Sequence, residues 1–205
     1  MKILTFILGE FATNCYLVIH ENSKKACLID PAVYDDEIVN VIITEGITLE
    51  YIILTHGHFD HILGANIFKE KTGAKITIHG IEFEYLQDLL KSLTSLYSGG
   101  KIVVDKYINE NDVLIFGGIS LRVIHTPGHT RGSCCFTCEN EKVMFTGDTL
   151  FNGSIGRCDF DGGDYNAMLL SLQKLKALNQ NYRIYPGHGD FTTLDNEKAT
   201  NPYLI

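Results

Sequence analysis

The sequence predicts an α+β protein with an αββα architecture, in which two mixed β-sheets pack face to face and helices cover their outer faces. In each half of the chain, segments with strand periodicity come before segments with helical periodicity. The 205 residues, 45% of them hydrophobic, suffice for a sizeable core, and no linker or low-complexity tract divides them. We therefore expect a single domain over residues 1–205.

The first half of the chain begins with three stretches of alternating apolar and polar residues, as expected for strands with one buried face. The run YIIL at 51–54 is apolar throughout, which predicts a strand buried on both faces. Apolar residues with helical spacing between these segments indicate helices. The predicted strands are 2–8, 14–20, 25–30, 51–54 and 75–79, and the predicted helices are a short one between Asp36 and Gly46, 62–71 and 82–97.

The second half returns to strands, which are separated by Gly, Asn and Asp turn signals. One helix interrupts them, because Met168, Leu172 and Leu175 share a helical face. The last predicted strand runs directly into the sequence PGH at 186–188. The predicted strands are 102–104, 113–116, 121–125, 134–137, 143–146 and 182–185, and the predicted helix is 165–178.

Charge and the first residues restrict the possible partners. The chain has 17 basic and 25 acidic residues, and its net charge of −8 would repel a phosphate backbone and offers no cationic surface to anionic lipid. The opening apolar run is interrupted by Glu10 and Asn14 before it reaches the length of a membrane span or secretory signal. We therefore expect a cytoplasmic protein that acts on neither nucleic acid nor membranes.

The six cysteines are irregularly spaced in a fairly long chain, so we expect reduced thiols rather than a disulfide framework. Cys135 and Cys138 form a C-x-x-C sequence, but the second pair that a zinc ribbon needs is missing. Both are expected to be small buried residues on a strand and its turn. The cysteines are Cys15, Cys27, Cys134, Cys135, Cys138 and Cys158.

The sequence HGHFDH at 56–61 places three imidazoles and one carboxylate in six residues, directly after a predicted strand. Chance is a poor explanation for such density. Further His and Asp residues follow three other predicted strands, and four strand ends can converge on one rim, where loops carry ligands on a rigid scaffold. The candidate metal ligands are His56, His58, Asp60, His61, His129, Asp148 and His188.

Imidazole and carboxylate ligands without clustered thiolates favour zinc, with iron and manganese as competitors. Seven ligands exceed the three protein ligands of a single catalytic zinc, so we expect two divalent metal ions with one bridging carboxylate. A purely structural metal site is a poorer interpretation, because structural zinc sites usually close with four Cys or His ligands.

Four motifs in this sequence are similar to those of the metallo-β-lactamase superfamily. They are HGHFDH, TPGHT at 126–130, FTGDTLFNGSIGRCDF at 145–160 and YPGHG at 185–189. They resemble its short glyoxalase II-like (hydroxyacylglutathione hydrolase-like) members, and the similarity extends to TT…NPYL at 192–204. The resemblance implies the fold of that family and a ligand assignment. His56, His58 and His129 would hold the first metal, Asp60, His61 and His188 the second, and Asp148 would bridge them.

These features together predict a hydrolase, with Asp60 and Asp148 as the candidate catalytic residues. Two metals would lower the pKa of a shared water towards ~7 and so supply a bridging hydroxide without a protein general base. A thiolate leaving group, with a free pKa around 8.5, departs without an acid, whereas an amine needs one. Since no dedicated acid is evident, we expect a small-molecule thioester, either hydroxyacylglutathione or a related acyl-thiol.

Two departures from the family pattern bear on the substrate. Members that are lactamases commonly carry a Cys ligand where this chain has Asp148, which argues against antibiotic hydrolysis. Full-length glyoxalase II enzymes continue into a helical domain that grips glutathione, whereas 17 residues follow His188 here. An alternative reading is an iron-dependent persulfide dioxygenase of the same fold, which binds one iron through two His and one Asp.

Three further residues are candidates for supporting roles. Asp30 stands at a strand end, where it can orient a metal-bound His or simply stabilise a turn. Arg157 and Asp159 follow Asp148 in the same loop. They can bind a substrate carboxylate, or they can form a local ion pair with each other.

Overall fold

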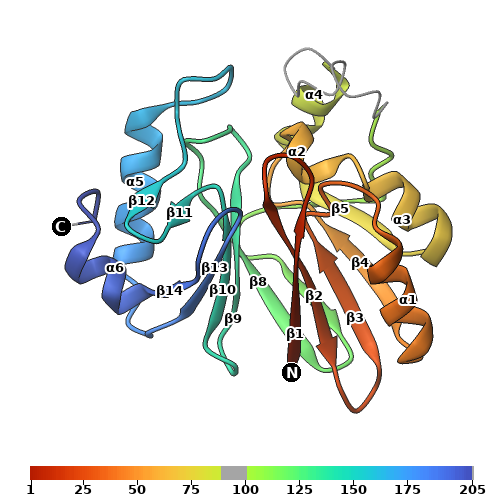
Figure 1. Ribbon diagram of the computed structural model, residues 1–205. Coiled ribbons are helices and arrows are strands. Elements are labelled where there is room, and N and C mark those ends of the chain that lie inside the picture. Colours follow the sequence, from red (N-terminus) through yellow and green to blue (C-terminus); the bar gives the residue numbers. More distant parts are fainter. Residues whose placement is uncertain (89–100, 205) are drawn as a thin grey trace.

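The computed structural model describes residues 1–88 and 101–204 and contains two six-stranded sheets (Figure 1). In spatial order, the first sheet contains β1 (Lys2–Leu8), β2 (Thr13–His20), β3 (Lys25–Ile29), β4 (Thr48–Ile53), β5 (Lys75–His79) and β6 (Lys106–Ile108). The second contains β14 (Thr192–Thr193), β13 (Arg183–Pro186), β10 (Val143–Gly147), β9 (Cys134–Cys138), β8 (Ile119–His125) and β7 (Val113–Phe116). A separate hairpin pairs β11 (Leu150–Phe151) with β12 (Ser154–Ile155).

Both sheets are mixed. In the first sheet β1 to β3 are antiparallel and β3 to β6 are parallel. In the second sheet β10 and β13 are parallel and the other pairs are antiparallel. Strands β8, β10 and β13 therefore run in one direction, so their carboxyl ends meet at one edge of the second sheet.

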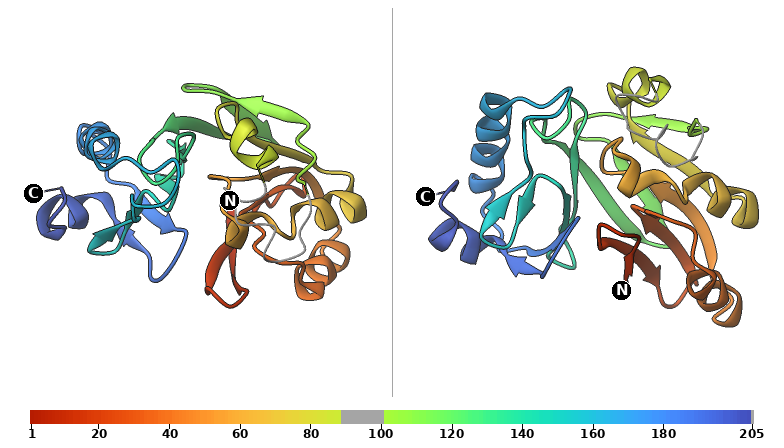
Figure 2. Two further views of the ribbon diagram at one scale, coloured as in Figure 1. Left: turned by 90° about the horizontal axis from the view of Figure 1, so that it is seen from above. Right: turned by 45° about the horizontal axis from the view of Figure 1, so that its top comes forward.

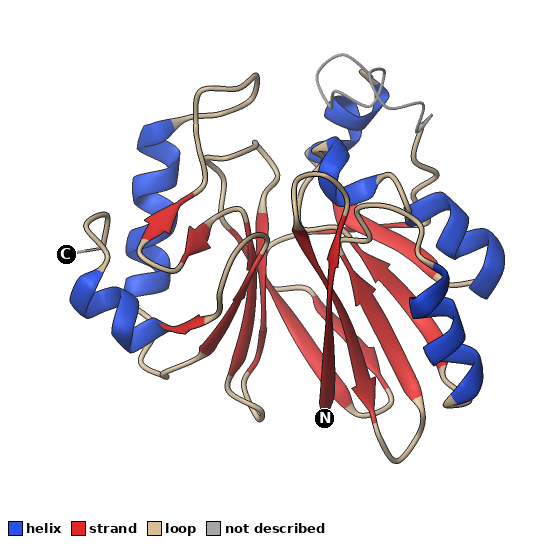
Figure 3. Ribbon diagram, viewed as in Figure 1, coloured by secondary structure: helices blue, strands red, loops and turns tan. Residues whose placement is uncertain are grey.

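Helices cover the outer faces of the two sheets, which confirms the predicted αββα sandwich (Figures 2 and 3). Helices α1 (Asp36–Thr44) and α3 (Ala65–Thr72) lie outside the first sheet, and α5 (Tyr165–Lys176) and α6 (Leu194–Thr200) lie outside the second. The short helices α2 (Phe59–Ile62) and α4 (Glu82–Gln87) lie near the upper rim in Figure 1.

Three buried hydrophobic clusters separate these four layers. One packs the outer face of the first sheet against α1 and α3, for example through Phe68. A second lies between the two sheets and includes Tyr16 and Phe136. A third packs the second sheet against α5 and α6, with Met168 and Leu194 as members. Each sheet is thus buried on both faces, which explains why strands such as β9 are buried at every residue.

The structure differs from the sequence-based prediction in the connection before β6. The predicted strand at 102–104 is wrong, because residues 101–104 have no regular structure and Lys106–Ile108 pairs with β5 instead. Side chains of α3 form hydrogen bonds with the backbone of this segment instead of a neighbouring strand. Asn66 accepts from Val103 N at 3.0 Å and donates to Lys101 O at 2.9 Å, and Lys69 donates to Val103 O at 3.1 Å.

The predicted helix at 62–71 is divided into α2 and α3. Gly64 lies between them, and a Cβ at this position would lie 2.6–2.7 Å from backbone atoms of Pro31 and Val33. The predicted helix at 82–97 begins correctly at Glu82, and α4 ends at Gln87. The remainder of that prediction, residues 89–97, lies outside the described residues. The short strands β11, β12 and β14 were not predicted, because a strand of two residues leaves no periodicity to detect.

The six cysteines form no disulfide, as predicted, and all of them except Cys158 are buried. Cys135 and Cys138 lie on β9. Among the helices of the described part of the chain, none has both the length and the apolar composition that a membrane crossing requires.

The core between the sheets gives a first prediction. Phe136 is fully buried there, so Phe136→Ala should lower the free energy of unfolding by about 3–5 kcal/mol through lost burial and a new cavity. Denaturant titration with a fixed metal content measures this loss. Ile115, which is 61% exposed on β7, supplies the control, since Ile115→Ala should change stability by at most about 0.5 kcal/mol. A similar effect of both substitutions would contradict the assigned core.

Candidate metal centre

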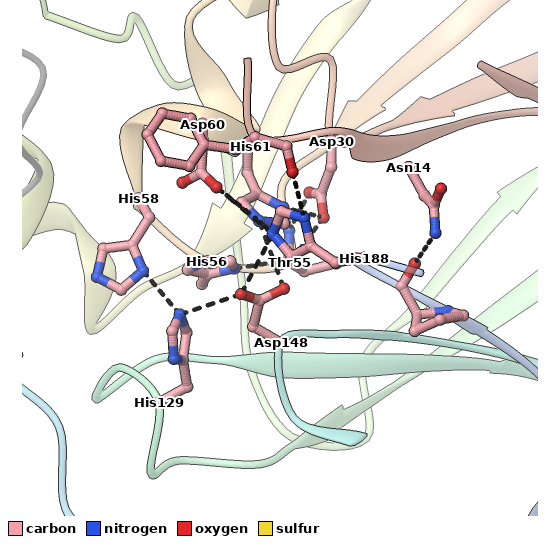
Figure 4. A network of polar contacts seen from close by, with 12 residues as sticks. Asn14, Asp30, Thr55, His56, His58, Asp60, His61, His129, Asp148 and His188 are labelled. Carbon is pink, nitrogen blue, oxygen red and sulfur yellow. Dashed lines mark hydrogen bonds and ion pairs between the residues drawn. The ribbon is translucent and has the colours of Figure 1, made fainter. Parts of the chain in front are cut away.

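The seven candidate ligands lie together at one rim of the sandwich (Figure 4). They come from loops at the carboxyl ends of four strands, as the sequence predicted. The segment that follows β4, including α2, carries four of them, and the loops after β8, β10 and β13 carry one each. In order, these are His56, His58, Asp60 and His61, then His129, Asp148 and His188.

Their donor atoms form three overlapping groups in which all members lie within 4.8 Å of one another. The groups are His56, His58 and His129; His56, His61 and Asp148; and Asp60, His61 and His188. His58 Nδ1 lies 2.7 Å from His129 Nε2, and His61 Nε2 lies 3.2 Å from His188 Nε2. The first and third groups share no residue, so the rim offers two separate sets of three donors.

Asp148 lies between these two sets. Its Oδ1 is 3.4 Å from His61 Nε2 on one side, and its Oδ2 is 3.5 Å from His129 Nε2 on the other. The same Oδ2 lies 3.6 Å from His188 Nε2. A carboxylate with one oxygen near each set has the position that a bridging ligand requires.

Hydrogen bonds at the outward nitrogens orient four of the five imidazoles. The Nδ1 atoms of His61, His129 and His188 lie 2.9 Å from Asp30 Oδ2, 2.7 Å from Arg157 O and 3.1 Å from Phe11 O, all of which can only accept. These bonds place the proton on Nδ1 when the ring is neutral, so Nε2 presents a lone pair to the shared space. Such outer acceptors are the usual partners of metal-binding histidines.

Asp30 supports two of the imidazoles from the end of β3. It accepts from Thr55 N at 2.8 Å and from Thr55 Oγ1 at 2.7 Å, in addition to His61 Nδ1. Because the Thr55 hydroxyl has only one proton, Oγ1 accepts from His56 Nδ1, which lies 3.0 Å away. Of the two roles considered for Asp30, the structure therefore shows the orientation of histidines.

Contacts from the first sheet fix the loop that carries His188. Asn14 donates three hydrogen bonds of 2.8–3.1 Å to carbonyls in residues 186–189, and Tyr16 OH donates to Pro186 O at 2.5 Å. Asn14 and Thr55 were not singled out from the sequence. The available signal was an Asn directly before the apolar run of residues 15–19 in β2, whereas nothing local distinguished Thr55.

Burial and neighbouring charges divide the imidazoles into two kinds. Burial lowers the pKa of His56 and His129, and burial together with the like charge of His129 lowers the pKa of His58 to about 3. Burial also acts to lower the pKa of His61, but Asp148, Asp30 and Asp60 outweigh it and raise this pKa to about 10. The first set thus consists of neutral imidazoles, and the second lies in a negative field.

The residues fit a pair of divalent cations. Two buried donor atoms at the rim, His56 Nε2 and Asp148 Oδ1, have no hydrogen-bond partner. Donors bound to one tetrahedral zinc at about 2.0–2.2 Å would lie roughly 3.3–3.6 Å apart. The separations found between neighbouring donors, 2.7–3.7 Å, bracket this range.

A cavity of about 620 Å³ opens over the rim. His56 and His61 lie beneath it and are almost fully buried. Four phenylalanines form its apolar walls. The described residues lining it are Phe11, His58, Phe59, Asp60, His129, Asp148, Phe151, Gly156, Arg157, Phe160 and His188.

Arg157 and Asp159 form the local ion pair that was one of their two predicted roles. The Nε and Nη2 atoms of Arg157 donate to the two carboxylate oxygens of Asp159 at 2.7 Å each. The guanidinium also lies 3.8 Å from the centroid of the Phe160 ring. Arg157 lines the cavity, so a role in substrate binding stays a prediction.

Comparisons with known proteins agree with this geometry. A family profile described as the Metallo-beta-lactamase superfamily matches residues 8–188. A Haemophilus influenzae protein named hydroxyacylglutathione hydrolase GloC is 36% identical over 100% of this chain and 98% of its own length.

Two solved structures are similar over nearly the whole chain. The structure of BLEG-1, titled a B3 metallo-beta-lactamase, has a TM-score of 0.88, is 32% identical and covers 99% of both chains. TTHA1623, solved in a di-iron-bound form, has a TM-score of 0.86 and is also 32% identical, covering 98% of this chain and 100% of its own.

The support given by Asp30 leads to a second prediction. Asp30→Ala would leave the Thr55 amide, the Thr55 hydroxyl and His61 Nδ1 buried without their acceptor, so the metal-free protein should lose about 3 kcal/mol or more. Chemical denaturation of the metal-free protein measures this effect. Asp30→Asn, which keeps one acceptor, should lose less. Equal stability of Asp30→Ala and the wild type would rule out the network.

Proposed function

Because this chain belongs to the metallo-β-lactamase superfamily, we propose that it is a two-metal hydrolase that cleaves a small thioester. The observation that carries the proposal is the pair of three-donor sets with Asp148 between them. His56, His58 and His129 would hold one cation, Asp60, His61 and His188 the other, and Asp148 would reach both. TTHA1623, whose structure holds two irons, supports a pair of metals and makes iron a candidate beside zinc and manganese.

Two divalent cations at these positions would lower the pKa of a water molecule towards ~7 and polarise the acyl carbonyl. The protein residues supply the rest of the environment. Asp60 and Asp148 would offset part of the cationic charge, and Phe151 and Phe160 add apolar surface to the cavity wall. The outer hydrogen bonds of the histidines hold their rings in place, so that little reorganisation is needed during the reaction.

The leaving group is inferred from the acids of the cavity. Among the described residues that line it, the only carboxyl groups are Asp60 and Asp148, and both are candidate metal ligands. Neither is therefore free to protonate a departing amine. A thiolate needs no such acid. The name of the Haemophilus influenzae relative, hydroxyacylglutathione hydrolase, supports a thioester substrate in a protein of similar length.

The cavity favours a less charged carrier than glutathione, which has two carboxylates. Arg157 is the only basic residue among the described residues lining it, apart from the histidines, and Asp159 already pairs with it. Four phenylalanines supply apolar surface to the same wall. We therefore expect glutathione to be gripped weakly, and a thioester of a smaller thiol to fit at least as well.

Hydrolysis of a β-lactam is a second candidate, because one similar structure is titled a B3 metallo-beta-lactamase. Opening this ring releases an amine, and the lack of a free acid in the described cavity wall disfavours that step. The persulfide dioxygenase alternative requires a single iron held by two His and one Asp. It would leave most of the seven assembled donors without a role.

The assignment of Asp148 is tested by Asp148→Ala. This change removes a donor close to both sets, so hydrolysis should fall by about 100-fold or more, whereas stability should change by less than about 2 kcal/mol. Initial rates, metal content and denaturation are measured on the same preparations. Asp195→Ala, at an exposed acid on α6, serves as the control and should leave all three unchanged. Near-normal hydrolysis by Asp148→Ala with full metal content would show that the assignment is wrong.

The substrate is tested by metal quantification of the native protein together with steady-state kinetics. We expect two metals per chain, and hydrolysis of a hydroxyacyl-glutathione thioester with a high KM. The same acyl group on a smaller thiol should give an equal or higher kcat/KM, because contacts to the carrier are made about equally in the ground and transition states.

The other outcomes separate the alternatives. A clear preference for the glutathione ester would contradict the inference about the carrier and leave the two-metal hydrolase intact. Faster turnover of a β-lactam than of any thioester would favour the second candidate. One iron per chain with oxygen consumption would favour the dioxygenase and contradict the proposal.

A further inference from the structure

Glu82 is a buried acid without a basic partner. It is the first residue of α4, its side chain is 0% exposed, and no Lys or Arg within residues 1–88 and 101–204 forms an ion pair with it. Burial raises the pKa of Glu82, while the nearby Thr130 hydroxyl and the amides of Gly132 and Gly57 act in the opposite direction. A buried carboxylate costs free energy unless nearby groups stabilise it, so its neighbours indicate its role.

The carboxylate lies between two loops that carry candidate ligands. Its Oε1 accepts from Gly132 N at 2.6 Å, three residues after His129. Its Oε2 faces Gly57, which separates His56 from His58, and a Cβ built on Gly57 would lie 2.7 Å from this oxygen. The Gly57 loop follows β4 of the first sheet, and the Gly132 loop follows β8 of the second. Oε2 has no hydrogen-bond partner, so this second contact is one of close packing. Glu82 therefore contacts both loops that carry the first donor set.

The two loops fit closely around α4. A Cβ on Gly132 would lie 2.6 Å from Glu82 Cγ, and a Cβ on Gly57 would lie 3.0 Å from the Tyr85 ring. The Tyr85 ring is also edge to face with His58, with the centroids 5.8 Å apart. Glycine at both positions lets the loops approach a side chain that larger residues would push away.

Building on the proposed two-metal function, we propose that Glu82 is a positioning residue, whose carboxylate holds the His56–His58 loop against the His129–Gly132 loop and so sets the spacing of the three-histidine donor set. Glu82 is not itself a candidate metal ligand.

The first test compares Glu82→Gln with Glu84→Gln, a matched control at an exposed acid on the same helix. Zinc binding to the metal-free proteins is measured by chelator competition. For Glu82→Gln we expect the affinity of one zinc equivalent to fall by about 10–100-fold, as is typical when the group behind a ligand is lost. Glutamine keeps the size of the side chain and an acceptor for Gly132 N, so the Tm of the metal-free protein should stay within about 3 °C of the control.

Two outcomes would overturn the proposal. Unchanged zinc affinity would show that Glu82 does not position the donors. A loss of affinity with an equal loss of metal-free stability would show a merely structural role. If Glu82→Gln does not fold, Gly132→Ala tests the same contact from the other side, and a normal zinc affinity in that variant would equally contradict the proposal.

A second measurement separates this proposal from the proposed function. In the metal-free protein, the NMR signals of the His58 and His129 rings should shift in Glu82→Gln and stay in place in Glu84→Gln. If the wild type binds no divalent cation, the proposed function fails and this comparison still decides the role of Glu82. Unshifted ring signals in Glu82→Gln would refute the positioning role.

Discussion

The metal centre depends on the hydrogen bonds accepted by Asp30. This residue directly follows β3 and has a φ of +50°, a conformation that costs free energy for a side chain other than glycine. Its carboxylate accepts hydrogen bonds from the segment that follows β4, where it fixes Thr55 and His61 directly and His56 through the Thr55 hydroxyl. One buried acid thus sets the orientation of two imidazoles, and the neighbouring strands β3 and β4 keep it in register.

The rest of the centre is assembled across the interface between the sheets. Asn14 and Tyr16 of β2 hold the loop of His188, and a Cβ on Gly147 would lie 2.4 Å from Thr55 Oγ1, so the loop of Asp148 lies directly against the network of Asp30. None of the donor sets belongs to one sheet alone. The hydrophobic core between the sheets therefore determines the separation of the donors. The same packing that stabilises the fold also sets the geometry of the donor sets.

The sequence revealed the ligands because each follows a strand with a strong local pattern. The strand ends were predicted within one or two residues, and the connected loops carry unusual densities of His and Asp. The supporting residues were harder to find. Glu82 contacts a loop 50 residues away and Asn14 one 172 residues away, and such contacts leave no periodic pattern. The strand predicted at 102–104 failed for a related reason, since Asn66 of a distant helix satisfies that backbone.

The two donor sets present different environments to a cation. His56, His58 and His129 are neutral nitrogen donors, with the acid Glu82 behind their loops. The other set includes the carboxylate of Asp60 and lies beside Asp148 and Asp30, whose charges raise the pKa of His61 and also favour a cation there. Nitrogen donors suit zinc, whereas added carboxylate suits harder cations such as manganese. The unequal charge of the two sets therefore gives the rim two chemically distinct positions, and Asp148, which lies close to both, would be shared by the two cations of the proposed function.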